Sequence, residues 1–565
     1  MRTPPAPTLP SLLLTLCAAQ ACAGELDAEL ADDAPTQTRA GDDLSPTPYA
    51  TPGQWTHPEL PCGEGARELV AEYGIIAPKP PSAYNPPTPE ESCEDPDSDA
   101  CTVKVISTTT ELADLVDGPY TGPLDIVLAD GIYQANELPG AEDGVAYLSL
   151  NGAHRLWAKS AGGAVLTFGI YAGGNPDAVV DPDDLGDPVV ARFFGPEFHG
   201  LVFDLPDPRF AALFDDVGVG DDQVPQDAAL ANWGLSRDML VEDCWFHGSG
   251  LVRRGIFAAQ PRGLRIRRVE VLDFTRFGIH IDRGSDASTP IAAADGARVE
   301  DVMIRGVADP EWSSQCPHEN CANPEIEPPP PPPPPGAYCP GTQEHGLWIG
   351  DDHTTVERAR VRDVGWAGVI VADAAHRVLN TVLRDIDVDD TGTNARNDGS
   401  GVAFERGNTS PRLERFCVGA GSGRGVHSEW DHWNEPGGSN GTENIGVQIL
   451  HGFSRAEHVG VSLDKGTIHA RIHDVRIENA DIGGMILHRN NLIALDDGPG
   501  CCTTSTWSDI TMAGVSGCEL TFSRYASPEP PPAICPPDPN PSVPVCEAFP
   551  ADPADFHCAD ALTCP

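Results

Sequence analysis

The clearest signal in this sequence is a short hydrophobic pattern that returns along the middle of the chain. Each copy reads apolar, two polar residues, a small or apolar residue, one variable residue and apolar. The copies lie at residues 241–246, 266–271, 299–304, 356–361, 378–383, 413–418, 472–477 and 507–512. Several intervals between copies are 22 to 35 residues, which is the range of solenoid repeats. The apolar positions at the end of each copy alternate, as a half-buried strand requires, and the two polar residues predict a corner.

A glycine followed by a short apolar strand forms a second element between these copies. Its copies begin at Gly278, Gly346, Gly368, Gly401, Gly460 and Gly484. Glycine suits the tight bend into each strand. Two or three strands per turn, with no helix-length segment between them, predict an all-β right-handed parallel β-helix over residues 101–525. Leucine-rich and ankyrin solenoids are excluded because their helical periods and signatures are absent.

The repeat also predicts which side chains form the core. The first apolar position of each copy should point inward and stack on the next copy. We therefore expect one buried column that contains Val241, Val299, Val356, Val378 and Ile472.

The segments around the repeats have other compositions. Thr108 and Glu111 have the spacing of a capping box, so we expect a short helix over 111–116 that caps the open end of the solenoid. Residues 24–100 are acidic and proline-rich and predict a flexible, dispensable linker.

Two further segments interrupt or follow the repeats. Residues 305–345 form an insertion with a proline run and three cysteines, which cannot join a central sheet ladder. Residues 526–565, rich in proline and cysteine, predict a disulfide-tied or disordered tail.

The start of the chain predicts export. Residues 1–23 read as a signal peptide, with an apolar run and the cleavage pattern Ala19-Gln20-Ala21. Cleavage before Cys22 would instead create the lipid anchor of a bacterial lipoprotein. No stretch is long and apolar enough for a transmembrane segment, so we expect a secreted or cell-surface protein.

The 17 cysteines favour an oxidising compartment and disulfide bonds whose pairing the sequence leaves open. Cys244 and Cys417 fall inside repeat strands and are expected to be buried thiols. The formal net charge of −49 argues against a nucleic-acid partner. We expect a monomer whose partner is a polysaccharide or a cell-surface glycan.

The repeats, the strand and turn over 124–133 and the cap together resemble the pectate-lyase-like right-handed β-helix superfamily, over roughly residues 101–525. That superfamily includes polysaccharide lyases, glycoside hydrolases, epimerases and non-enzymatic surface proteins. The resemblance therefore implies a fold and a glycan-related function but selects no activity.

Charged residues directly follow the glycine-led strands and should stack on one face of the solenoid. The carboxylates expected to hold Ca²⁺ are Asp282, Glu405 and Asp464, and the cations expected to act beside them are Arg283, Arg406 and Lys465. This is the arrangement of a Ca²⁺-assisted lyase of uronic-acid polymers, in which the cation removes the C5 proton. Lys465 is the preferred base because a crowded lysine can lower its pKa. Plain surface ion pairs at turns are the alternative.

Two more motifs are candidate glycan contacts. The loop 427–435 contains His427, Trp430 and Trp433, and tryptophan faces suit sugar stacking; His488 and Arg489 should line the same groove. The stretch 387–394 is rich in carboxylates and could hold Ca²⁺, with an acidic solvated loop as the alternative.

A further motif, Gly350-Asp351-Asp352-His353, provides an adjacent carboxylate pair. Such pairs serve glycoside hydrolases as acid and base, and β-helix polygalacturonases carry one in a similar place. Their Asn-Thr-Asp, Gly-His-Gly and Arg-Ile-Lys motifs are absent from this chain. A glycoside hydrolase is therefore the second alternative, after a non-catalytic adhesion or carbohydrate-binding protein.

Overall fold

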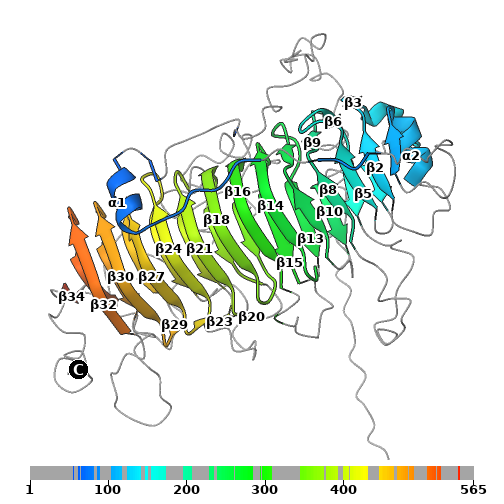
Figure 1. Ribbon diagram of the computed structural model, residues 1–565. Helices are drawn as coiled ribbons and strands as arrows, with labels where there is room; N and C mark the ends of the chain where they lie inside the picture. Colours follow the sequence, from blue (N-terminus) through cyan, green and yellow to red (C-terminus); the bar gives the residue numbers. More distant parts are fainter. Residues whose placement is uncertain are drawn as a thin grey trace, which may run out of the picture. The chain divides into compact units, whose positions relative to one another are not determined.

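A computed structural model describes the chain over residues 62–88, 103–172, 195–206, 228–307, 344–488 and 506–523, with short gaps, together with Trp55 and residues 545–546. The described residues form a stack of parallel strands around one continuous apolar core (Figure 1). The predicted right-handed parallel β-helix is confirmed. Three sheets run along the stack and contain 17, 13 and 4 described strands; they are called sheets A, B and C below.

The strands of sheet A carry the predicted repeat. They are β1 (Val103–Ile106), β2 (Asp125–Leu128), β3 (Gly131–Tyr133), β5 (Arg155–Ala158), β6 (Ala164–Leu166), β8 (Glu197–His199), β9 (Val202–Asp204), β11 (Leu240–Glu242), β12 (Trp245–His247), β14 (Arg265–Leu272), β16 (Arg298–Val307), β18 (Thr355–Val364), β21 (Val382–Val388), β24 (Arg412–Val418), β27 (Gln448–Ser454), β30 (Arg471–Glu478) and β32 (Thr506–Ala513).

The glycine-led strands form sheet B, and four two-residue strands form sheet C. Sheet B contains β4 (Tyr147–Leu150), β7 (Gly169–Ala172), β10 (Ala228–Trp233), β13 (Arg254–Ala259), β15 (Phe277–Asp282), β17 (His345–Ile349), β19 (Ala367–Val371), β22 (Ser400–Glu405), β25 (Arg424–Glu429), β28 (Val459–Leu463), β31 (Gly483–His488), β33 (Cys518–Ser523) and the antiparallel β34 (Val545–Cys546). Sheet C contains β20 (Val378–Leu379), β23 (Asn408–Thr409), β26 (Asn444–Ile445) and β29 (Thr467–Ile468).

The register of sheet A shows how the repeat folds. Val241, Val299, Val356 and Ile472 lie in one buried column, as predicted. The predicted copy at 378–383 is wrong in register, because Leu383 pairs with Val356 in place of Val378. Val378 is still buried in the same core, but it comes from sheet C. The two segments share the apolar spacing, and only the intervening turn distinguishes them.

The predicted corner is a bend inside a continuous strand. The second polar residue of each copy has a left-handed backbone, for example Asp243, Arg268, Asp301 and Arg358. This conformation is a local kink, and pairing continues on both sides of it from β14 onward. Sheet A therefore wraps two sides of the core.

The N-terminal end of the solenoid is capped as expected. Helix α2 (Thr109–Val116) buries Leu112 and Ala113 in the same core cluster as the first strands. Its capping box is present, because Glu111 N donates to Thr108 Oγ1 and Thr108 N donates to Glu111 Oε2. A short 3-10 helix, η1 (Ala135–Glu137), follows β3. Neither helix type in the described part of the chain reaches the length and apolarity of a bilayer-crossing segment.

Part of the predicted linker is an ordered strap across sheet A. Residues 62–81, called the strap, include helix α1 (Arg67–Glu72) and run from β24 toward β16 in Figure 1. Cys62, Ala66, Leu69 and Ile75 are buried in a cluster with Cys417 and Phe453. The expectation of a flexible linker is wrong for this part, because a few apolar residues spaced along a proline-rich segment suffice for packing.

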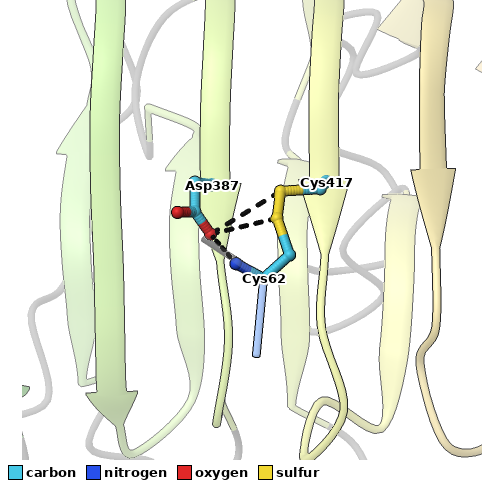
Figure 2. Close-up of side chains that lie close together, drawn as sticks. All are labelled: Cys62, Asp387 and Cys417. Atoms are coloured by element: carbon cyan, nitrogen blue, oxygen red, sulfur yellow. Dashed lines mark hydrogen bonds between the residues drawn. A yellow bond between two sulfur atoms is a disulfide. The ribbon is translucent and has the colours of Figure 1, made fainter. Parts of the chain in front are cut away.

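A disulfide fixes the strap to the sheet. Cys62 and Cys417 are bonded, with Cα atoms 6.0 Å apart, which is a usual separation for a disulfide. Cys62 N also donates to Asp387 Oδ1 at 2.9 Å, as Figure 2 shows. The expectation that Cys417 is a free thiol is wrong, because its side chain lies on the outer face of sheet A. Cys244 is a free, buried thiol as predicted, and burial raises its pKa.

Candidate active site on sheet B

Three carboxylates meet where β15 and β17 end. Ile281 pairs with Ile349, so Asp282 lies beside Gly350, and Arg283 lies beside Asp351 on the next rung. Adjacent rungs of a parallel sheet are about 4.8 Å apart. The solenoid therefore brings Asp282 and Asp351–Asp352 together, although the sequence separates them by about seventy residues.

The Asp351–Asp352 pair is buried, and its oxygen atoms have different partners. Asp352 N donates to Asp351 Oδ1 at 2.9 Å, and Leu379 N donates to Asp352 Oδ1 at 2.9 Å. Arg283 Nη1 lies 3.3 Å from Asp352 Oδ2. Asp351 Oδ2 is buried and has no hydrogen-bond partner among the described residues. One oxygen atom at the centre of the site is therefore available for a proton.

The environment of Asp351 favours its neutral form. Burial is the main reason that its pKa is raised to about 8; the carboxylates of Asp352 and Asp282 raise it further. The hydrogen bond from Asp352 N and the guanidinium of Arg283 lower it. Asp351 therefore holds a proton at neutral pH, whereas the Asp282 side chain is 32% exposed to solvent.

Aromatic and imidazole rings surround this acid cluster. A Cβ atom on Gly350 would lie 3.3 Å from both Asp282 Oδ1 and Trp348 Nε1, so Gly350 leaves the room in which these two groups meet. His280 pairs with Trp348 on the adjoining rung, and Phe277 packs against both rings. Burial lowers the pKa of His280 well below its usual range, helped by the nearby Arg254, so its ring is neutral at neutral pH.

The predicted carboxylate column exists in the register of sheet B, but its described members are far apart. Asp282, Gly350, Ala372 and Glu405 follow one another at the ends of successive strands. Three rung spacings separate Asp282 from Glu405, which amounts to about 14 Å. Glu405 pairs instead with Glu429 of β25 through the backbone.

Several predicted site residues lie outside the described part of the chain. These are Arg406, Trp430, Trp433, Asp464, Lys465 and Arg489, and the side chain of His488 at the end of β31. His427 is described and buried in β25, where Arg424 Nη1 lies 3.1 Å from its ring nitrogens. The structure therefore places His427 inside the outer face of sheet B and brings Asp282 and Arg283 into the acid cluster.

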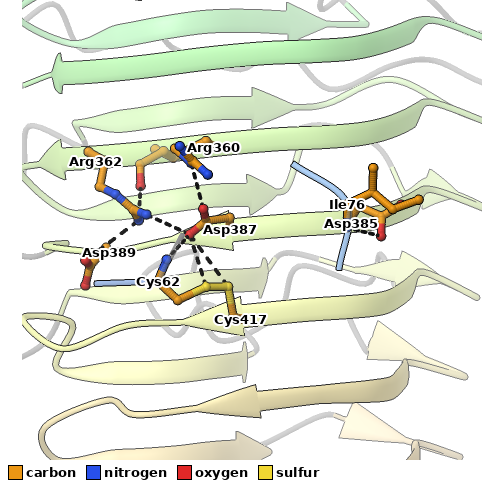
Figure 3. The surroundings of a disulfide bond; sticks show 9 residues. Cys62, Ile76, Arg360, Arg362, Asp385, Asp387, Asp389 and Cys417 are labelled. Atoms are coloured by element: carbon orange, nitrogen blue, oxygen red, sulfur yellow. Dashed lines mark hydrogen bonds and ion pairs between the residues drawn. A yellow bond between two sulfur atoms is a disulfide. The ribbon is translucent and has the colours of Figure 1, made fainter. Parts of the chain in front are cut away.

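The acidic stretch 387–394 belongs to sheet A and to the strap. Arg360 Nε and Arg362 Nη2 lie 2.7 and 2.8 Å from Asp387, which they neutralise (Figure 3). Cys62, Asp387 and Cys417 are the only three potential metal ligands within reach of one ion among the described residues. The disulfide removes both thiolates, so this cluster stabilises the strap and leaves no metal donors.

The sequence matches no protein-family model and no curated relative. Similar solved structures include the catalytic unit of a GH87 α-1,3-glucanase from Streptomyces thermodiastaticus (10% identity, 73% of this chain and 62% of that chain, TM-score 0.40). A GH87 α-1,3-glucanase catalytic domain in complex with tetrasaccharides has 8% identity over 78% of this chain and 70% of its own, with a TM-score of 0.43.

The surface adhesin PfbA of Streptococcus pneumoniae has 9% identity over 74% of this chain and 90% of its own, with a TM-score of 0.39. This chain thus spans less than two thirds of the Streptomyces catalytic unit. Scores and identities at this level carry no argument about activity. The strand register of the chain itself defines the class, a right-handed parallel β-helix protein.

Proposed function

We propose that this protein is a glycoside hydrolase whose active site is the acid cluster on sheet B. One observation carries the proposal: a buried carboxyl that holds a proton at neutral pH, Asp351, lies on the rung beside a solvent-exposed carboxylate, Asp282. Two carboxyl groups in different environments are what acid-catalysed cleavage of a glycosidic bond requires.

The roles follow from the two environments. Asp351 donates a proton to the glycosidic oxygen, and Asp282 assists the attacking water molecule or the developing positive charge on the sugar. Arg283 fixes Asp352 and thereby the turn that holds Asp351. Asp351 is buried in this structure, so entry of the glycan beside Asp282 is the step that brings the glycosidic oxygen within reach.

The described geometry favours hydrolysis over Ca²⁺-assisted elimination. Calcium ligands lie about 2.3–2.6 Å from the ion, whereas Asp282 and Glu405 are three rungs apart. Arg283, one of the cations expected to remove a proton, is buried against Asp352. An elimination site built on Asp464 and Lys465 stays a hypothesis about residues outside the described ranges.

The test is a screen of the purified protein against neutral and uronic-acid polysaccharides, with Ca²⁺ and with a chelator. Hydrolysis releases reducing ends without the ultraviolet absorbance of an unsaturated uronate. We expect reducing ends only, with no dependence on Ca²⁺. Absorbance that needs Ca²⁺ would support a lyase, and glycan binding without cleavage would support a non-catalytic surface protein; either result contradicts the proposal.

A further inference from the structure

A pocket of about 360 Å³ lies between the strap and the outer face of sheet A, away from the acid cluster. Its lining residues are Glu72, Tyr73, Glu414, Arg415, His451 and Asp474. Pockets of roughly 300 Å³ and more hold small organic ligands. The volume therefore suits a single sugar ring.

Three of the lining residues come from one column of sheet A. Arg415, His451 and Asp474 occupy the bend position of β24, β27 and β30 on successive rungs. His451 Nδ1 lies 3.0 Å from Asp474 Oδ2, and Arg415 Nη2 lies 2.6 Å from Asp385 outside the pocket. The floor of the pocket is thus a fixed row of polar groups.

The strap supplies the opposite wall. Tyr73 is half-buried, and its ring centroid lies 6.0 Å from that of Phe453, which anchors the aromatic ring. Glu72 is exposed at the end of α1. The wall therefore combines an aromatic face with a carboxylate.

The charge in the pocket is negative on balance. Glu72, Glu414 and Asp474 contribute carboxylates, while the guanidinium of Arg415 is bound on both sides by Asp385. Burial raises the pKa of the Tyr73 hydroxyl to about 12, and the carboxylates of Asp474 and Glu72 add to the increase. An anionic sugar such as a uronate is disfavoured here by repulsion.

We propose that this pocket binds an amine-bearing sugar residue, such as a glucosamine unit of a glycan. The ammonium group would pair with Glu72 and Asp474 and lie near the face of Tyr73. The sugar hydroxyls would bond to His451 and Glu414. The site is separate from the acid cluster, so it does not depend on the hydrolase proposal.

Calorimetric titration with three probes tests the proposal: the tetramer of glucosamine, the tetramer of N-acetylglucosamine and the tetramer of galacturonic acid. We expect binding of the glucosamine tetramer alone, weakened by added salt because the contact is between charges. Equal binding of the acetylated tetramer, which lacks the ammonium group, would overturn the proposal, and so would no binding at all.

Substitutions locate the binding. Glu72→Gln and Tyr73→Leu should each weaken binding by about ten-fold, the scale of one desolvated cation–π or charged contact. Glu68→Gln on the same exposed helix is the matched control and should leave binding unchanged. Asp282→Asn should also leave it unchanged. Binding that survives Glu72→Gln and Tyr73→Leu, or that is lost with Asp282→Asn, would place the ligand elsewhere and refute the site.

Discussion

The outer faces of sheets A and B use carboxylates in two different ways. On sheet A, acids and bases alternate in one column, and the pairs Asp243–Arg268, Asp301–Arg358 and Asp385–Arg415 are 2.6–2.7 Å apart. The strap adds backbone donors, because Ile76 N donates to Asp385 and Lys79 N donates to Asp301. On sheet B, by contrast, three carboxylates share one arginine, and Asp351 Oδ2 has no hydrogen-bond partner among the described residues.

This contrast separates structural charges from charges that suit chemistry. A buried carboxylate is costly unless it is paired and hydrogen-bonded. Sheet A satisfies that condition rung after rung. The acid cluster on sheet B satisfies it only by keeping Asp351 protonated, and incompletely compensated acids are typical of functional sites. The two faces therefore make opposite predictions for the same kind of substitution.

The largest effect is expected for Asp351→Asn on sheet B. If Asp351 is the proton donor, its loss should reduce glycan hydrolysis by about 10²–10⁴-fold, while the fold is retained because an amide can occupy the space of the neutral acid. The measurement is the rate of reducing-end release, with circular dichroism to check the fold. Glu405→Gln, three rungs away in the same column, is the control and should keep full activity.

The strap gives the next largest effect. Cys62→Ser opens a loop that closes 355 residues in the sequence, and loss of such a disulfide costs about 2–5 kcal/mol of the free energy of unfolding. Denaturant titration of the oxidised protein measures the change. An unchanged midpoint would show that the strap is dispensable, and the sheet A half of the comparison would fail.

A smaller loss is expected for Asp385→Asn on sheet A. This substitution leaves Arg415 and Ile76 N without their charged acceptor, at a cost of about 1–3 kcal/mol. Hydrolysis should be unaffected, because Asp385 is on the other face. A loss of activity at unchanged stability would contradict the division of roles between the sheets.

The pH dependence of stability sharpens the same point. Asp351 has a pKa of about 8 in the folded protein and an ordinary value of 3.8 otherwise. The folded state therefore binds its proton more tightly, so the stability contributed by this group is present at acid pH and is lost as pH rises from about 4 to about 8. Asp351→Asn should lack this component and melt at a higher temperature than wild type at pH 8. Parallel melting curves across pH would show that Asp351 does not titrate in this way.

The repeat could be predicted because the core imposes it. Each rung needs apolar side chains at the same positions, as Val299, Val302 and Ile304 show. The prediction failed where that requirement relaxes. In β27 the same positions are Ile449, Gly452 and Ser454, so the copy was missed. At 378–383 a turn into sheet C imitates the spacing.

The strap and the site depend on long-range packing, which the local pattern does not contain. The strap could not be predicted from periodicity, since Cys62 and Leu69 find their partners on β24 and β27. Asp282 and Asp351 were both recognised as candidates, but in separate motifs. Their proximity depends on a rung register that crosses the 305–345 insertion. A signal was present, because both motifs end glycine-led strands at the same position.

The pH dependence of hydrolysis by wild type is the most direct test of the central claim. If Asp351 is the general acid, the rate should fall as pH rises through about 8, because the proton that it donates is then lost. A rate that stays constant or increases across this range would contradict the assignment. So would a falling limb that persists in the residual activity of Asp351→Asn.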